Sequence, residues 1–117
     1  MKLHHIGISV PNIDEAYYQL FGSVKEVTGK VYDGGQNAVL KMYNWNGAPV
    51  ELIENDKPWN MYHICFEVES LVDAVRIAKD NGYVEITEPK PAPLFDGRRV
   101  VFVMGRNHDI IEFLEAN

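Results

Sequence analysis

The chain has 117 residues, of which 46% are hydrophobic and 24% charged, as is typical of a soluble globular protein. Its net charge of −6 argues against a general nucleic-acid binder, because neutralising phosphates requires a basic face. The single cysteine, Cys65, excludes an intrachain disulfide, and no apolar run approaches the roughly 20 residues of a membrane span. We therefore expect a cytoplasmic protein with neither nucleic-acid nor membrane partners.

Residues 3–10 form the first predicted strand and carry a histidine on a polar face. Side chains alternate between the two faces of a strand, so His5 shares its face with Gly7 and Ser9. The opposite face carries His4 and a row of aliphatic residues. We expect the aliphatic face, with His4, to pack on a helix and the small polar face to border a cavity.

A helix should follow directly. Asn12 is placed as an N-cap with Glu15 at the third helical position, a pattern typical of helix starts. An apolar stripe at helical spacing continues to Phe21, and Gly22 predicts a left-handed stop. The remaining predicted elements of this half are strands at 24–33 and 37–45, a turn at 33–35, a hairpin turn at Asn46-Gly47, and a strand at 50–54 that carries Glu51.

The pattern restarts after a short polar connection at 55–60, in which Pro58 blocks regular structure. The second half is predicted to contain a strand at 61–68 with His63, a helix capped by Ser70 and ended by Gly82, a strand at 83–87, an extended proline-rich loop without helix potential at 89–93, a strand at 99–104, a turn at 105–109, and a strand at 110–115 with Glu112. Each half therefore follows the order β-α-β-β-β.

The spacing of the histidine and glutamate strands supports an internal repeat. His5 and His63 are 58 residues apart, and each precedes its glutamate by a similar interval, 46 residues to Glu51 and 49 to Glu112. A unit of this size cannot bury its own sheet face, so two copies must pair, either within one chain or between chains.

Two imidazoles and two carboxylates are a mixed nitrogen and oxygen donor set that suits Zn, Ni, Co, Mn or Fe. By the alternation of strands, Glu51 and Glu112 point away from aliphatic neighbours that would face helices. A carboxylate in an apolar trough is costly unless it binds a cation or a proton. Taken singly, each histidine could be structural and each glutamate could be an edge-strand charge; the matching pattern of four favours a metal site.

Other reactive side chains have simpler interpretations. Cys65 lies on the same strand face as His63, and we interpret it as a small buried hydrophobic residue. Solvated surface charge is the simpler interpretation of four cationic residues that could also bind a substrate carboxylate or phosphate. These residues are Lys90, Arg98, Arg99 and Arg106.

Three segments resemble one known family, namely 3–12, 62–68 and 97–102. Over essentially its whole length the chain resembles the vicinal-oxygen-chelate superfamily, which includes glyoxalase I, methylmalonyl-CoA epimerase, extradiol dioxygenases and the fosfomycin- and bleomycin-resistance proteins. The epimerase and glyoxalase I branches fit best. The resemblance implies an α+β fold in which two βαβββ modules, 1–57 and 60–117, form a half-open mixed β-sheet barrel within a single glyoxalase-like domain, 1–117.

The family's four metal positions fall on His5, Glu51, His63 and Glu112. The resemblance implies a metal-dependent isomerase or lyase that works through an enolate or enediolate on a small 2-oxo-derived hemithioacetal or CoA thioester. It further implies a divalent cofactor (Zn, Ni, Co or Mn), with Glu51 or Glu112 as both ligand and base. The alternatives are a non-catalytic or drug-sequestering small-molecule binding protein, and an extradiol dioxygenase that would use His5, His63 and Glu112.

Two departures from epimerases are visible in the sequence. Gly35 stands where those enzymes place a further glutamate before a glutamine, and the connection at 55–60 is shorter. Family members often pair modules across subunits, so we also expect a homodimer, with Trp45 and Trp59 available for its interface.

Overall fold

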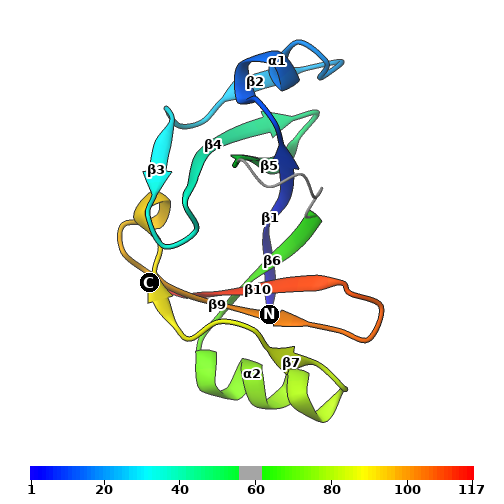
Figure 1. Cartoon of the computed structure of the whole chain (residues 1–117), viewed down its shortest axis with the longest axis vertical. Helices are drawn as coiled ribbons and strands as arrows, with labels where there is room; N and C mark the ends of the chain where they lie inside the picture. Colours follow the sequence, from blue (N-terminus) through cyan, green and yellow to red (C-terminus); the bar gives the residue numbers. More distant parts are fainter. Residues whose placement is uncertain (56–61) are drawn as a thin grey trace. The chain divides into compact units, whose positions relative to one another are not determined.

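The computed structural model describes residues 1–55 and 62–117 (Figure 1). It divides into two compact units, which we call the first unit (residues 5–62) and the second unit (residues 1–4 and 63–117). Each is a mixed β-sheet with one α-helix. Within the described ranges, no helix has the length and apolar character needed to cross a bilayer.

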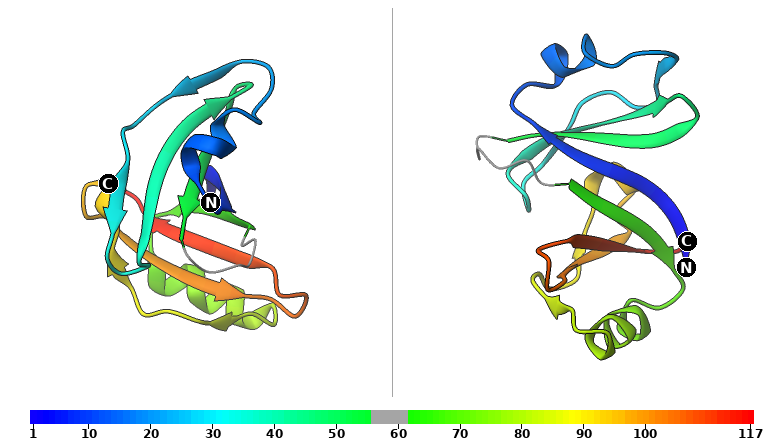
Figure 2. Two further views of the ribbon diagram at one scale, coloured as in Figure 1. Left: turned by 45° about the horizontal axis from the view of Figure 1, so that its top comes forward. Right: turned by 90° about the vertical axis from the view of Figure 1, so that its right-hand side faces the viewer.

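The first unit contains a four-stranded path in the order β2-β4-β5-β1, with β3 also paired to β4. Its elements are β1 (Lys2–Val10, whose first residues belong to the second unit), α1 (Ile13–Tyr17), β2 (Val24–Glu26), β3 (Val31–Asp33), β4 (Ala38–Trp45) and β5 (Ala48–Glu54). The β1 strand runs parallel to β5, and β4 and β5 form the long antiparallel hairpin seen in Figure 2. The hairpin turns at Asn46-Gly47, as predicted, and both residues have positive φ.

The second unit repeats this connectivity in the order β6-β10-β9-β7, with β8 also paired to β9. Its elements are β6 (Tyr62–Val68), α2 (Leu71–Asp80), β7 (Val84–Glu85), β8 (Lys90–Pro91), the 3₁₀ helix η1 (Pro93–Phe95), β9 (Arg99–Met104) and β10 (Ile110–Glu115). Here β6 runs parallel to β10, as β1 does to β5. The α+β class and the two βαβββ modules are thus confirmed; that the two units form one domain with modules 1–57 and 60–117 stays a prediction.

Each sheet buries one face against its helix. In the first unit, Ile13 of α1 packs with Tyr43, Val50 and Leu52, and Ile8 of β1 adjoins this cluster. In the second unit, α2 lies against β9 and β10 (Figures 1 and 2). Its contacts join the predicted stripe to the sheet: Leu71, Ala74, Val75 and Ala78 against Val101, Val103 and Phe113. The helix-facing residues predicted on β5 and β10 therefore pack as expected, whereas Ile6 of β1 is exposed.

Both helix starts are capped as the sequence predicts. The Asn12 side chain accepts a hydrogen bond from the Glu15 backbone N–H at 2.9 Å, and the Ser70 hydroxyl accepts one from the Asp73 N–H at 3.2 Å. These caps satisfy amide groups that have no partner within the helix.

The predicted helix to Phe21 is wrong in its length, because α1 ends at Tyr17. Beyond it the chain continues in tighter turns, with Gln19 N–H bonded to the Ala16 carbonyl and Leu20 N–H to that of Tyr17. Phe21 instead sets its ring against Trp45 at 5.3 Å between centroids.

The predicted strand at 24–33 is interrupted. Val27 and Thr28 both donate to the Met42 carbonyl, so two residues oppose one, as in a β-bulge, and the chain separates into β2 and β3. The proline-rich loop is extended at Lys90 and Pro91, which pair with β9, as predicted. The prediction that it has no helix potential is wrong, because η1 begins at Pro93 and proline suits the first helical position. The predictions about Pro58, Trp59 and the connection at 55–60 concern residues 56–61, outside the described ranges, apart from Asn55.

Candidate metal centre

The first unit brings His5 and Glu51 together on one sheet face. In the parallel pairing of β1 with β5, Gly7 lies opposite Glu51, so His5 precedes the glutamate's partner by two residues and shares its face. His5 Nε2 is 3.8 Å from Glu51 Oε1. Both residues are buried, with 0% and 3% of their surface exposed. The first half of the predicted ligand set is thus assembled within this unit.

The second unit builds the same pair from His63 and Glu112. In the parallel pairing of β6 with β10, Cys65 lies opposite Glu112, so His63 again precedes the glutamate's partner by two residues. His63 Nε2 is 3.1 Å from Glu112 Oε1, and both residues are buried. The histidine–glutamate pair is therefore a product of the repeated βαβββ topology, formed once in each unit at the same register.

A large apolar side chain adjoins each glutamate from the third strand. Met42 of β4 lies opposite Glu51, and Phe102 of β9 lies opposite Glu112. Both are buried, and the Phe102 ring meets the His63 imidazole edge to face, with 5.5 Å between centroids. Phe102 was not singled out from the sequence, because its place beside His63 depends on strand register rather than on its own residue type.

The donor chemistry of each pair fits a divalent metal. Two ligands held about 2.1 Å from one ion lie about 3.0 Å apart at a 90° ligand angle and about 3.4 Å apart at the tetrahedral angle. The 3.1 Å between His63 and Glu112 falls in this range, and the 3.8 Å between His5 and Glu51 is somewhat longer. A buried carboxylate in apolar surroundings needs a nearby cation or donor, and a metal shared with an imidazole meets that need. That all four residues meet around one ion stays a prediction.

The other sequence candidates lie in structural roles. Arg98 donates to the Glu67 carboxylate and to the Glu115 carbonyl oxygen, and Arg99 pairs with the Glu115 carboxylate. The Arg98 guanidinium lowers the pKa of Glu67 below its ordinary range. Both arginines are thus engaged with acidic residues of their own unit.

Cys65 and His4 each contact apolar or aromatic side chains of the second unit. Cys65 is fully buried with Val100 and Leu114, which supports its interpretation as a small hydrophobe. His4, which we expect on the helix side of its strand, sets its ring edge to face against Phe95 of the 3₁₀ helix η1, with 4.9 Å between ring centroids. Strand alternation alone could not reveal this partner, because η1 lies far from His4 in the chain.

Asp33 is a buried carboxylate that the sequence placed only in a turn. It is 3% exposed, and its two oxygens accept hydrogen bonds from the Gly35 N–H at 2.9 Å and the Gln36 side chain at 2.8 Å. These bonds hold the turn that joins β3 to β4.

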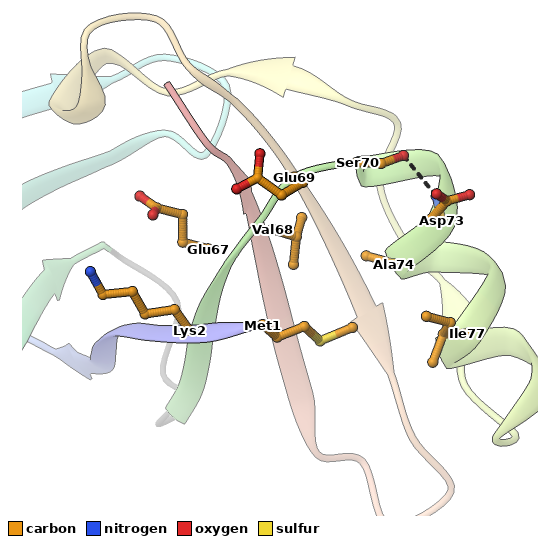
Figure 3. A pocket seen from close by; sticks show the side chains of 9 residues that line it. All are labelled: Met1, Lys2, Glu67, Val68, Glu69, Ser70, Asp73, Ala74 and Ile77. Atoms are coloured by element: carbon orange, nitrogen blue, oxygen red, sulfur yellow. Dashed lines mark hydrogen bonds between the residues drawn. The ribbon is translucent and has the colours of Figure 1, made fainter.

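A separate cavity of about 420 Å³ lies beside α2 in the second unit and contains none of the four predicted ligands. Its rim is mostly acidic, with Glu67, Glu69 and Asp73 near Lys2, over a floor that includes Val68 (Figure 3). The cavity is thus distinct from either histidine–glutamate pair.

Comparison with solved structures shows the same fold in other proteins. A hypothetical protein from Bacillus halodurans is 25% identical, with a TM-score of 0.79 over 99% of this chain and 94% of the other. Methylmalonyl-CoA epimerase from Mycobacterium tuberculosis is 18% identical, with a TM-score of 0.74 over 99% and 88% of the two chains. No curated protein sequence matches.

The family comparison covers most of the sequence. Residues 4–102 match the model of the glyoxalase, bleomycin-resistance protein and dioxygenase superfamily. This stretch includes three of the four predicted ligands and residues 4–57 of the first module. The chain, with its glyoxalase-like fold, belongs to the Glyoxalase/Bleomycin resistance protein/Dioxygenase superfamily.

Proposed function

We propose that this protein is a metal-dependent isomerase or lyase that acts through an enolate or enediolate. The proposal rests on the two buried pairs, His5–Glu51 and His63–Glu112, which occupy the same register in both units. A donor set of two imidazoles and two carboxylates suits Zn, Ni, Co or Mn. Membership of a superfamily that contains such enzymes supports the same reading.

Each residue has a defined part in the proposed chemistry. A divalent ion that contacts two neighbouring substrate oxygens would stabilise the negative charge that develops when an α-proton leaves. His5 and His63 would hold the ion, together with Glu51 and Glu112. One of the glutamates would also take the α-proton onto a carboxylate oxygen and return it to the same or to the neighbouring carbon. The surrounding apolar side chains would keep bulk water from that proton.

The substrate class we propose is a 2-oxo-derived hemithioacetal or a CoA thioester. The turn after β3 favours the hemithioacetal. Asp33, the carboxylate nearest to Gly35 in sequence, already accepts hydrogen bonds from the Gly35 N–H and the Gln36 side chain. It therefore does not replace the additional base expected of an epimerase. Glyoxalase-like chemistry needs only a glutamate of the metal site.

The alternatives fit the buried charges less well. A drug-sequestering protein would gain nothing from two carboxylates that are costly to bury. An extradiol dioxygenase would need only His5, His63 and Glu112, whereas Glu51 is also buried beside a histidine. The full donor set favours the isomerase or lyase.

Proton exchange tests the proposed function directly. The metal-loaded protein is incubated in deuterated water with a panel of hemithioacetals and CoA thioesters, and substrate deuteration is followed by NMR. We expect metal-dependent exchange at the α-carbon, and a loss of about 10²- to 10⁴-fold in Glu51→Gln or Glu112→Gln, whichever removes the base.

The matched control is Glu115→Gln, a glutamate of the same strand as Glu112 that pairs with Arg99 instead. It should retain exchange. Absence of exchange across the whole panel, with metal demonstrably bound, would reject the isomerase or lyase in favour of a binding protein.

A further inference from the structure

Phe102 is an aromatic residue in contact with His63, one of the predicted ligands. Its ring stands edge to face on the His63 imidazole, with an interplanar angle of 86° and 5.5 Å between centroids. Phe102 is 6% exposed and belongs to the apolar cluster on the His63 face of the second unit, with Cys65 and Leu114. The contact is therefore part of a packed interior rather than a chance surface approach.

Register places the same ring beside the glutamate of the pair. Phe102 lies opposite Glu112 in the antiparallel pairing of β9 with β10, and directly opposed residues share a sheet face. A phenyl ring offers no hydrogen bond or charge, so it can act on His63 and Glu112 only through shape and exclusion of water.

The first unit provides an internal comparison. There the residue opposite the glutamate is Met42, whose unbranched side chain adapts its shape easily. The distance between imidazole nitrogen and carboxylate oxygen is 3.8 Å in that unit and 3.1 Å in the second unit. The closer pair is the one whose glutamate lies opposite an aromatic residue.

We propose that Phe102 is a positioning residue, which sets the plane of the His63 imidazole so that Nε2 faces the Glu112 carboxylate before metal binds. The proposal extends the metal-site function given above and assigns the second unit the better prearranged half of the ligand set. Phe102 does not touch substrate in this role; it acts through His63.

The test compares Phe102→Met with Phe113→Met. Both phenylalanines are buried, at 6% and 4% exposure, and they lie on adjacent strands of the same sheet. They face opposite ways, since Phe113 packs with α2 while Phe102 packs with His63. Methionine is the residue that the first unit carries at the position of Phe102, so the variant copies a side chain already tolerated in the repeat.

Two readouts are taken on each variant: the imidazole ¹H–¹⁵N signals of His63 in metal-free protein, and affinity for Co²⁺ by chelator competition. We expect Phe102→Met to change the chemical shifts of His63 and to weaken Co²⁺ binding about 10-fold, as is typical of substitutions at residues that orient metal ligands. Phe113→Met should leave both within error of wild type.

Equal effects of the two substitutions, or none from Phe102→Met, would overturn the positioning role. The metal-free spectra separate this result from a failure of the proposed function. If wild-type protein binds no Co²⁺, the metal-site function falls, while the His63 signals still decide whether Phe102 orients the imidazole.

Discussion

Glu67 shows how a single charged residue is tuned by its neighbour. It belongs to β6, and its carboxylate accepts a hydrogen bond from the Arg98 guanidinium, which lowers the pKa of Glu67. Lys2 and His4 add smaller effects in the same direction. The pair joins the end of β6 to the start of β9, so it ties the strand of His63 to the strand of Phe102.

This pairing makes a prediction about pH. A carboxyl whose pKa is lowered by folding stabilises the protein above its unfolded pKa of about 4.3, and loses that effect as the pH falls through the lower folded value. Glu67→Gln should therefore lower Tm at pH 7, and the difference from wild type should shrink toward zero in more acidic buffer. Thermal melts followed by circular dichroism between pH 7 and pH 3 measure it.

The control is Glu69→Gln, an exposed neighbour in the same cavity rim. It should melt like wild type throughout this range. A Glu67→Gln difference that is unchanged or larger in acid would contradict the assigned pairing.

At the scale of elements, the junction between α1 and β2 depends on close packing around Gly22. Its φ is +83°, and Asn46 fits against it, accepting a hydrogen bond from the Ser23 N–H and donating one to the Phe21 carbonyl. A Cβ at Gly22 would lie 2.2 Å from Asn46 Oδ1. The segment that joins α1 to β2 and the β4–β5 turn are thus held together by one glycine–asparagine contact.

Gly22→Ala should lower the free energy of unfolding by about 1–3 kcal/mol, because alanine is strained at this φ and displaces Asn46. Gly29→Ala is the matched control in the same unit, since no heavy atom lies within 4 Å of its added Cβ. We expect Gly29→Ala to stay within about 0.5 kcal/mol of wild type. Urea titrations measure the free energy of unfolding of both variants. Equal decreases in the two variants would show that strain at Gly22 does not cause the destabilisation.

At the scale of the whole molecule, each unit contains one histidine–glutamate pair, and we propose that the two pairs share one ion. A ligand that binds only folded protein stabilises it by about 2.7 kcal/mol at 100 times its Kd. A divalent ion at this excess should therefore raise Tm by roughly 10 °C. Glu51→Ala and Glu112→Ala should each remove most of the rise if both units contribute to one ion, and metal analysis should give close to one ion per wild-type chain.

The matched control is Glu115→Ala, which should keep both the bound metal and the rise in Tm. If Glu51→Ala or Glu112→Ala melts and binds metal like wild type, that glutamate is not a ligand.

The same samples test the proposed homodimer, because light scattering should give twice the chain mass of 13.3 kDa.

The sequence by itself determined the two α-helices, the long strands, the repeat and the face of each candidate ligand. These follow from local physics: alternation along a strand puts His5 and Glu51 opposite their aliphatic neighbours, and side-chain capping at Asn12 and Ser70 needs only residues three positions away. The sequence therefore identified the donor set as two histidines and two glutamates on four strands.

Only the tertiary structure decided which atoms meet. The distance of 3.1 Å between His63 Nε2 and Glu112 Oε1 depends on the register of β6 with β10, two parallel strands that are far apart in the sequence. The contact between the Phe102 ring and His63 depends in turn on the register of β9 with β10. The end of α1, the interruption between β2 and β3, and η1 were likewise decided by turns and by pairing with distant strands. Such pairings join residues far apart in the chain, so their geometry is absent from any local pattern.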